Sequence, residues 1–292
     1  MFKNLWKNRV KLVEKNLIVE LKKNPALEEK LANAMEYSLM AGGKRLRPIL
    51  LMAAADAVNG TGEKFLTVAT AMEMIHTYSL IHDDLPAMDN DDYRRGKLTN
   101  HKVFGEATAI LAGDALLTLA FEVITRQENI SPEILLQIVK EFSTAAGQSG
   151  MVGGQSIDLE SEGKKIDMAT LKKMHLGKTG ALFKAAIRSG AILAGANFQQ
   201  LDALTIYAEK FGLAFQITDD ILDVVGDEKN LGKPIGSDEK NNKSTYVTLT
   251  SLDTAKNLAQ SAVDDAVDAL EIFGAEADFL RELVKYLIGR NK

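Results

Sequence analysis

The stretch Ser79-Leu-Ile-His-Asp-Asp-Leu-Pro-Ala-Met-Asp-Asn-Asp-Asp-Tyr-Arg-Arg-Gly96 places a group of aspartates directly after an apolar segment. A second acidic group, Thr218-Asp-Asp-Ile-Leu-Asp-Val224, follows another apolar segment much later in the chain. Carboxylates gathered in apolar surroundings need a cation to neutralise them. Hard oxygen ligands without cysteine favour magnesium, which commonly shares its coordination with substrate phosphates. Two such clusters facing each other would clamp a diphosphate.

The spacing within each cluster suggests how its carboxylates converge. Asp219 and Asp223 are four positions apart, which places both on one face of a helix. Asp83 and Asp89 are six apart, which an ideal helix would direct to different sides. Pro86 resolves this conflict, because it ends the helix and allows a turn to bring Asp89 back toward Asp83.

Basic residues accompany both acidic groups. The segment Gly42-Gly-Lys-Arg-Leu-Arg-Pro48 opens a helix, where glycine permits close backbone approach and a helix N-terminus favours anions. Arginine forks, which bind phosphate bidentately, follow the first cluster at Arg94 and Arg95. Lys178-Thr179-Gly180 is expected at another helix start, and Lys233 and Lys243 lie in a polar loop, residues 226–244, interpreted as a flap that closes over phosphate.

His76 has two readings from the residues alone. It follows Glu73 by three positions, the Glu-x-x-His pattern of carboxylate-bridged di-iron bundles. That architecture needs the pattern twice, and no other histidine has a glutamate three positions before it. An interior histidine with a satisfied hydrogen bond and a phosphate contact both remain open.

Helical periodicity dominates the chain, and no alternating run with turn signals predicts a strand. A second polar loop is expected over residues 156–167. The predicted helices cover residues 2–22, 27–39, 45–58, 64–85, 105–125, 132–147, 168–176, 179–195, 199–224, 244–249, 253–270 and 275–289.

Bulk composition indicates one large domain over residues 1–292. No Pro/Gly/Ser-rich linker divides the chain, and 46% of its residues are hydrophobic. A net charge of −5 argues against general nucleic-acid binding, and the absence of cysteine suits a reducing cytoplasm. No uninterrupted apolar run reaches membrane-spanning length, so stable membrane insertion is not expected. The basic N-terminus is read as an amphipathic helix, with a membrane-surface or targeting role as the alternative.

Five segments in order carry a resemblance to a known family. They are Gly43-Lys-Arg-Leu-Arg-Pro48, the Asp83–Gly96 run, Gly154-Gln-Ser-Ile-Asp-Leu159, Lys178-Thr179 and Phe215-Gln-Ile-Thr-Asp-Asp-Ile-Leu-Asp223. Together they resemble the trans-isoprenyl diphosphate synthases, and among these most closely the bacterial farnesyl-forming group. The resemblance extends from about residue 35 to 250, and the joint order of five motifs is far more specific than any one of them.

The resemblance implies an all-α fold, an isoprenoid-synthase-type helical bundle around a deep central cavity. Residues 1–292 would form a single polyprenyl synthetase domain, assembled as a homodimer. The implied reaction condenses isopentenyl diphosphate with dimethylallyl diphosphate and geranyl diphosphate, giving farnesyl diphosphate and diphosphate.

The resemblance also implies a role for individual residues. Asp83, Asp84, Asp89, Asp219 and Asp223 would bind Mg²⁺, with three ions present when substrate is bound. Isopentenyl diphosphate would be held by Lys44, Arg47, His76 and Arg95. Arg94, Lys178 and Lys233 would contact the allylic diphosphate, with Lys243 less firmly placed because the spacing of this flap varies in the family. Main-chain oxygens near Lys178 and Thr179, with Gln216, would stabilise the allylic cation.

Product length is assigned to Tyr78 and Ser79, five and four positions before Asp83. Helical spacing puts them about one turn from the metal site, where a bulky ring would stop growth near fifteen carbons. The alternative is that Tyr78 is a core aromatic with a satisfied hydroxyl.

Four rival functions remain to be weighed. A geranyl or geranylgeranyl diphosphate synthase differs only in product length. A terpene cyclase shares the metal clamp but binds no second diphosphate, which the Lys44/Arg47 segment disfavours. A non-catalytic partner subunit typically loses its aspartates, and a di-iron storage bundle requires the missing second motif.

Overall fold

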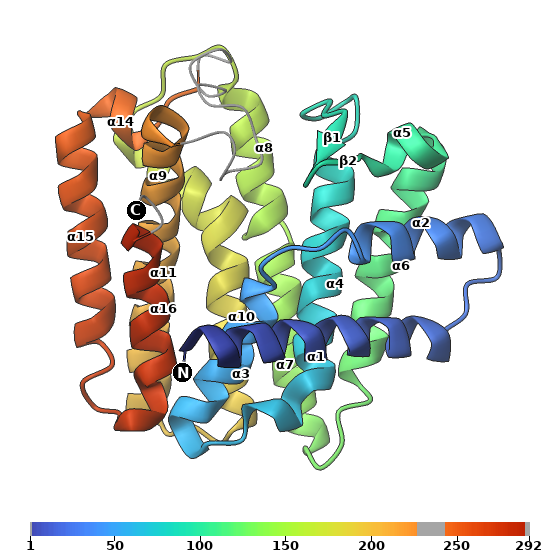
Figure 1. Cartoon of the computed structure of the whole chain (residues 1–292), viewed down its shortest axis with the longest axis horizontal. Coiled ribbons are helices and arrows are strands. Elements are labelled where there is room, and N and C mark those ends of the chain that lie inside the picture. The colour runs from blue at the N-terminus through green and yellow to red at the C-terminus, as the bar shows by residue number, and fades with distance from the viewer. Residues whose placement is uncertain (1, 227–242, 290–292) are drawn as a thin grey trace. The chain divides into compact units, whose positions relative to one another are not determined.

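A computed structural model describes residues 2–226 and 243–289, and it is built almost entirely of helices (Figure 1). The predicted all-α class is confirmed. The helices are α1 (Phe2–Lys23), α2 (Glu29–Leu39), α3 (Leu46–Asn59), α4 (Leu66–Asp83), α5 (Asn100–Phe104), α6 (Glu106–Ile124), α7 (Pro132–Ala146), α8 (Met151–Ser161), α9 (Met168–His175), α10 (Ala181–Leu193), α11 (Phe198–Val225), α14 (Tyr246–Leu249), α15 (Leu252–Asp268) and α16 (Asp278–Ile288). Short 3₁₀ turns occupy Gly62–Phe65 and Ala275–Ala277.

Three local features differ from the sequence-based expectation. Residues Tyr93–Arg94 (β1) and Lys97–Leu98 (β2) pair as a small antiparallel hairpin. Arg95 and Gly96, at its tip, both have positive φ, the backbone pattern of a type I′ turn. The strands are too short to show periodicity, and Arg-Gly is a weaker turn signal than Asn-Gly. The short helix α5 was also not anticipated.

The expected polar loop over residues 156–167 is wrong in its first half, because α8 continues to Ser161. The polar composition of residues 156–167 favours a loop, and Gly153 and Gly154 lower the helix propensity just before it. Packing overrides that preference: a Cβ on Gly154 would lie 2.0 Å from the backbone nitrogen of Lys178, so only glycine permits this contact.

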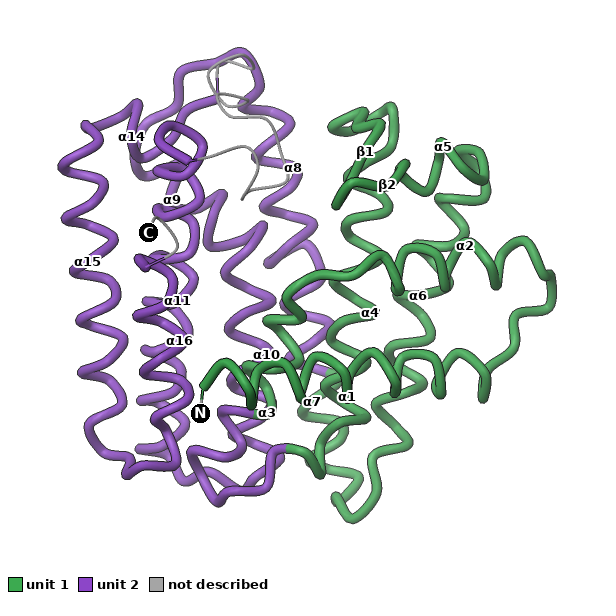
Figure 2. Tube along the Cα trace, viewed as in Figure 1, with its two compact units in different colours: residues 1–52, 63–139 green, residues 53–62, 140–292 purple. Residues whose placement is uncertain are grey.

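The chain folds as two compact units, coloured separately in Figure 2. Unit 1 contains residues 1–52 and 63–139, and unit 2 contains residues 53–62 and 140–292. Helices α3 and α7 each contribute to both units. A single domain over residues 1–292 stays a prediction.

Unit 1 is organised around α4. This helix packs against α6 along its length and also contacts α1 and α2. Its buried apolar side chains include Met72 and Ile75, while Val13 and Leu17 of α1 and Leu116 of α6 are also fully buried. The burial of apolar area from several helices around one central helix fixes the position of the polar residues at its ends.

Unit 2 is organised around α11, which packs between α10 and α15 and also contacts α16. An aromatic cluster joins α10 to α11: the ring of Phe183 lies 5.1 Å from those of Phe211 and Phe215. Tyr207 is fully buried, and its hydroxyl donates to the carbonyl of Leu280 in α16 at 2.9 Å. These contacts fix α11 in rotation and therefore fix the face on which its acidic residues project.

Helix α6 is the one described helix that is long and apolar enough to cross a membrane by length and composition. Asp114 lies within this helix, so it is not an uninterrupted apolar run. The same helix packs against α4, α2 and α5, and its inward residues are buried. The core helix of a water-soluble protein meets the same criterion.

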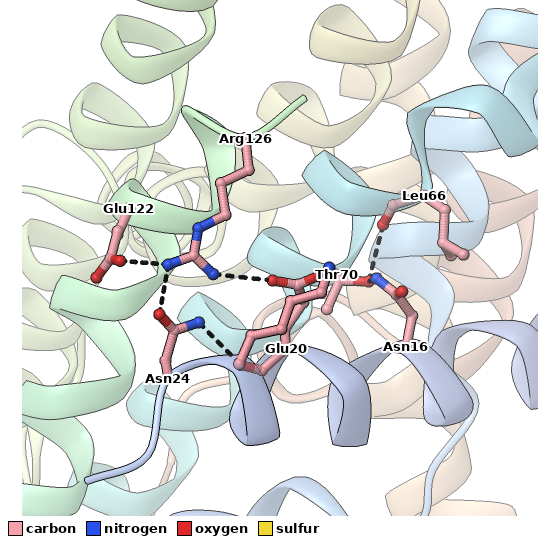
Figure 3. A network of polar contacts seen from close by, with 8 residues as sticks. Asn16, Glu20, Asn24, Leu66, Thr70, Glu122 and Arg126 are labelled. Carbon is pink, nitrogen blue, oxygen red and sulfur yellow. Dashed lines mark hydrogen bonds and ion pairs between the residues drawn. The ribbon is translucent and has the colours of Figure 1, made fainter. Parts of the chain in front are cut away.

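A polar network fastens the N-terminal helix to unit 1 (Figure 3). Glu20 of α1 is almost fully buried and accepts a hydrogen bond from Nη1 of Arg126 at 3.2 Å. Arg126 also donates to Asn24 and to Glu122. Asn16 donates to the hydroxyl of Thr70 in α4 at 2.8 Å. Because an unpaired buried carboxylate is costly, this network specifies how α1 docks.

Replacing Arg126 by alanine should lower the free energy of unfolding by about 2 kcal/mol, since Glu20 would be buried without its arginine. Lys23→Ala is the matched control, because Lys23 pairs with the same carboxylate from an exposed position. An exposed pair contributes roughly 0–1 kcal/mol, so the control should change little. Urea denaturation measures both variants. Equal losses would show that burial of Glu20 does not govern the network.

Candidate active site

The C-terminal end of α4 presents the first acidic cluster. The helix ends at Asp83, and the amide of Asp89 donates to the carbonyl of Asp83 at 2.9 Å. The turn expected after Pro86 is therefore confirmed: it returns the backbone of residue 89 to the last residue of the helix. Asn90, at the end of this turn, has a positive φ of 53°, a conformation that asparagine tolerates better than most residues.

Arg94 on β1 neutralises the aspartates at the end of α4. Its Nε and Nη2 atoms both lie 2.6 Å from Oδ1 of Asp84, and Nη2 lies 3.7 Å from Asp83. Burial raises the pKa of Asp84 to about 6, although the arginine opposes this shift. The charge of the Asp84 carboxylate is thus disfavoured by burial and favoured by a nearby cation.

A cationic cluster surrounds His76, two helical turns before Asp83 on α4. Burial, together with the positive charges of Arg47, Arg95, Arg94 and Arg45, lowers the pKa of His76 well below its ordinary value. Burial also lowers the pKa of Arg47 to about 10, with Arg95 repelling it and Glu73 partly offsetting the shift. Guanidinium groups that repel one another in a desolvated place are stabilised by a bound anion.

The loop before α3 is shaped for close approach by Arg95. Gly42 and Gly43 have φ values of 86° and 124°, which side-chain-bearing residues rarely adopt. A Cβ on Gly43 would lie 2.6 Å from the guanidinium carbon of Arg95, and Nη1 of Arg95 donates to the carbonyl of Gly42. Arg45 and Arg95 themselves have positive φ, so backbone strain is concentrated in the two segments that carry the cationic groups.

Arg45 is a structural residue that the sequence reading did not assign. Its side chain is fully buried, with Nη1 at 2.8 Å from Glu73 and Nη2 at 2.6 Å from the carbonyl of Leu39. Glu14 of α1 lies 3.4 Å from the same guanidinium. Arg45 therefore uses Glu73, the glutamate of the Glu-x-x-His pattern, as an ion-pair partner. The sequence shows only that Lys44, Arg45 and Arg47 are all basic. It does not show that the Arg45 side chain is turned into the protein, where it binds Glu73.

In unit 2, α11 carries the second acidic cluster. Asp219 and Asp223 lie four residues apart on this continuous helix, as the spacing predicts, and Gln216 precedes Asp219 by three residues. Asp220 has a separate partner: its Oδ2 accepts the backbone amide of Tyr246, the first residue of α14, at 2.7 Å. The middle aspartate thus ties α14 to α11.

Lys178 and Thr179 do not start a helix, which corrects the sequence-based expectation. They lie in a π-helical turn, Leu176–Gly180, that joins α9 to α10 without a break. Close contact with α8 explains the irregular turn, since Gly177 and Gly154 approach without room for side chains. Nζ of Lys178 lies 2.7 Å from Asp158 of α8. Such turns insert an extra residue, change the pairing of the carbonyls, and often occur at functional sites.

The carboxylates at the end of α4 are candidate ligands for a magnesium ion. Within residues 2–226 and 243–289, no three or more His, Asp or Glu side chains converge closely enough to hold a metal ion by themselves. Magnesium, however, is commonly bound by one or two carboxylates together with water and substrate phosphate. Asp83 and Asp84 fit that mode, because they offer two adjacent carboxylates at the end of α4, both close to the Arg94 guanidinium.

Comparison with known proteins agrees with this geometry. The family model described as polyprenyl synthetase matches residues 28–283. The chain belongs to the polyprenyl synthetase family. It is 50% identical over 279 residues to a farnesyl diphosphate synthase of Micrococcus luteus, covering 95% of this chain and 96% of the relative. It is also 47% identical to a geranylgeranyl diphosphate synthase of Cyanophora paradoxa, covering 89% and 87%.

Among solved structures, this polyprenyl synthetase resembles an FPP/GFPP synthase from Zymomonas mobilis in its apo form. The TM-score is 0.88 at 39% identity, and the match covers 98% of each chain. The predicted family is thus confirmed.

The structure brings some of the predicted site residues of this polyprenyl synthetase together and leaves others apart. Unit 1 gathers His76 with the cationic residues Arg47, Arg94 and Arg95, and it joins Arg94 to Asp83 and Asp84. Unit 2 holds Lys178, Thr179, Gln216, Asp219 and Asp223. The facing of the two acidic clusters stays a prediction, since each unit is described by itself. Lys233 lies outside the described residues, and Lys243 is half-buried just before α14.

The two residues assigned to product length occupy different surroundings on α4. The ring of Tyr78 is buried and meets that of His82 edge-on at 5.7 Å, and burial raises the pKa of Tyr78 to about 12. The His82 ring in turn lies against Gly113 of α6. Ser79 donates to the carbonyl of His76 on its own helix at 2.8 Å. Tyr78 therefore lies on the α6 side of α4.

His175 makes the stability of this polyprenyl synthetase sensitive to acid. Its ring lies 5.7 Å from that of Tyr246, and burial is the main cause that lowers its pKa to about 4. In the unfolded chain the His175 imidazole takes up a proton near pH 6.5, whereas in the folded chain it stays neutral down to about pH 4. The free energy of unfolding therefore falls as the pH drops from about 6.5 to 4.

His175→Gln, which cannot take up that proton, should remove about 2 kcal/mol of the loss in unfolding free energy between pH 7.5 and pH 5. Urea denaturation of both proteins at pH 7.5 and pH 5 measures the difference. An unchanged pH dependence in the variant would show that His175 is not a source of the acid sensitivity.

Proposed function

We propose that this chain is a farnesyl diphosphate synthase. It condenses isopentenyl diphosphate with dimethylallyl diphosphate and then with geranyl diphosphate, with magnesium as the cofactor. The observation that carries the proposal is that α4 displays two opposite charge environments on one side. His76 and Asp83 are seven residues apart, which separates them by roughly 10 Å along the helix. A cationic site for one diphosphate and a carboxylate site for a metal-bound diphosphate fit that arrangement.

The cationic cluster suits isopentenyl diphosphate, which keeps its diphosphate through the reaction. Arg47 and Arg95 offer guanidinium forks, Lys44 is exposed beside them, and neutral His76 can donate one ring N–H to a phosphate oxygen. No metal is needed here, because the three cationic side chains of Lys44, Arg47 and Arg95 supply the charge. This part of the site also argues against a terpene cyclase, which binds only one diphosphate.

The allylic diphosphate is assigned to the acidic residues. Asp83, Asp84 and Asp89 would hold magnesium from α4 and its turn, and Asp219 and Asp223 would hold it from α11. Bound magnesium supplies positive charge that stabilises the departing diphosphate. Arg94, Lys178 and Lys233 are assigned to the same diphosphate, with Lys243 nearby. Three magnesium ions with substrate bound, as the family resemblance implies, complete this part of the proposal.

Chemistry begins with heterolysis of the allylic carbon–oxygen bond, whose electron pair leaves with diphosphate. The backbone oxygens of Lys178 and Thr179 in the π-helical turn, with the side-chain oxygen of Gln216, lie in unit 2 and are assigned to stabilise the cation. The double bond of isopentenyl diphosphate then attacks this cation to form the new carbon–carbon bond. A proton leaves the resulting cation for the released diphosphate, since the sequence offers no obvious general base.

A homodimer is supported by the outer face of unit 1. Ile110 and Leu111 of α6 and Val103 of α5 are exposed by 45%, 57% and 44%. Apolar side chains grouped on the exposed face of an apolar helix are typical of a protein interface. Covering that face with a second copy accounts for the composition of α6 without a membrane. A cytoplasmic location agrees with a chain that contains no cysteine.

The assay for this function incubates the protein with isopentenyl and dimethylallyl diphosphates and magnesium, and then sizes the extracted products by chromatography. A fifteen-carbon product is expected, and excess chelator should abolish it. A dominant twenty-carbon product would favour the alternative function, a geranylgeranyl diphosphate synthase. The Cyanophora paradoxa relative has that name. Turnover that survives chelation would contradict the magnesium mechanism.

Tyr78→Ala should shift the product to twenty carbons or more, because removal of a buried ring opens volume next to α4 while Asp83 stays in place. Tyr78→Phe is the matched control: it keeps the ring and should still stop at fifteen carbons. A folded, active Tyr78→Ala variant that makes only farnesyl diphosphate would exclude Tyr78 as the limit.

A further inference from the structure

The N-terminal helix α1 contacts two consecutive residues, Lys44 and Arg45, in the loop before α3. The indole Nε1 of Trp6 donates to the main-chain carbonyl of Lys44 at 3.1 Å. Glu14, two helical turns later, lies 3.4 Å from the guanidinium of Arg45. Through these two contacts, helix α1 holds the backbone of the loop at Lys44 and its buried anchor, Arg45.

The conformation of this loop needs such external support. Gly42, Gly43 and Arg45 all have positive φ, and Arg45 is a residue for which that region is unfavourable. Arg45 is held by Glu73 and by the carbonyl of Leu39 as well as by Glu14. Lys44, between the glycines and the anchor, is exposed, and its backbone carbonyl accepts the Trp6 hydrogen bond.

We infer that α1 is a positioning element for the isopentenyl diphosphate site, with Trp6 as its principal residue. This inference rests on the proposed function. The Trp6 hydrogen bond fixes the peptide plane after Lys44, and Glu14 helps to fix Arg45. Together they set the backbone from which the Lys44 and Arg47 side chains project. Asp83, Asp84 and Asp89, which are assigned to the allylic diphosphate, lie at the end of α4 and in the turn after it and not on this loop, so the effect should be selective for one substrate.

The chain offers a built-in reporter of this coupling, because Trp6 is its only tryptophan. Its ring meets that of Phe2 edge-on at 5.5 Å, and its N–H contacts the loop directly. Binding of a diphosphate to the loop should alter the surroundings of the indole. Intrinsic fluorescence therefore reads the state of the loop without a label.

The test compares Trp6→Phe with the wild-type enzyme. Phenylalanine keeps an aromatic ring against Phe2 but removes the N–H donor. Calorimetric titration with isopentenyl diphosphate alone, which cannot react without an allylic partner, should show a Kd raised roughly three- to tenfold, as expected for one lost hydrogen bond. In turnover, KM for isopentenyl diphosphate should rise by a similar factor, while kcat and KM for dimethylallyl diphosphate stay within twofold.

Lys7→Ala is the matched control, because Lys7 lies next to Trp6 on the same helix with an exposed side chain and is not part of the network that docks α1. It should leave both KM values unchanged even if stability falls.

A Trp6→Phe variant with the wild-type Kd for isopentenyl diphosphate would overturn the inference, as would equal changes in KM for the two substrates. If Trp6→Phe does not fold, wild-type emission decides: a saturable change on titration with isopentenyl diphosphate supports the coupling, and constant emission refutes it. Absence of wild-type turnover would instead contradict the proposed function.

Discussion

The crowding of like charges along one face of α4 is the constraint on which the rest of unit 1 depends. Cationic groups gather around His76, and carboxylates gather at Asp83 and Asp84 two turns later. Like charges repel strongly where water is scarce. The fold separates the two groups along a rigid helix and places Arg94 between them, where it pairs with the acidic residues. An anion at one end and a metal-bound anion at the other would relieve both repulsions.

Other features of unit 1 follow from holding these charges in place. The glycines before α3 let the Arg95 guanidinium lie against the backbone, and the hairpin brings Arg94 and Arg95 to α4 from one tight turn. Arg45 forms a buried pair with Glu73. Removing either partner of such a pair leaves an uncompensated charge, so the pair fixes the loop in one arrangement. Unit 2 uses comparable means, with glycine contacts at the π-helical turn and Asp220 fastening α14.

The sequence predicts the fold well where a signal is local and repeated. Long helices with apolar periodicity, such as α1, α4 and α11, were found within a few residues of their ends, and Pro86 correctly predicted the turn that returns Asp89 to Asp83. Features that depend on contacts were missed. The sequence predicts a polar loop from residue 156, because the packing of Gly154 against the π-helical turn is not visible in sequence. The sequence assigns no role to Arg45, because its buried ion pair with Glu73 is a long-range contact. The predicted facing of Asp83 and Asp219 concerns residues of two different units, and local sequence patterns do not determine it.

The central claim is that α4 serves two diphosphates, only one of which needs metal. Calorimetric titration with inorganic pyrophosphate, with and without magnesium, tests it most directly. The account predicts one site per chain without magnesium and a second that appears when magnesium is added. Asp83→Ala should remove only the second, and Arg47→Ala should weaken only the first. A single class of sites with the same affinity under both conditions, or two sites that persist in Asp83→Ala, would contradict the account.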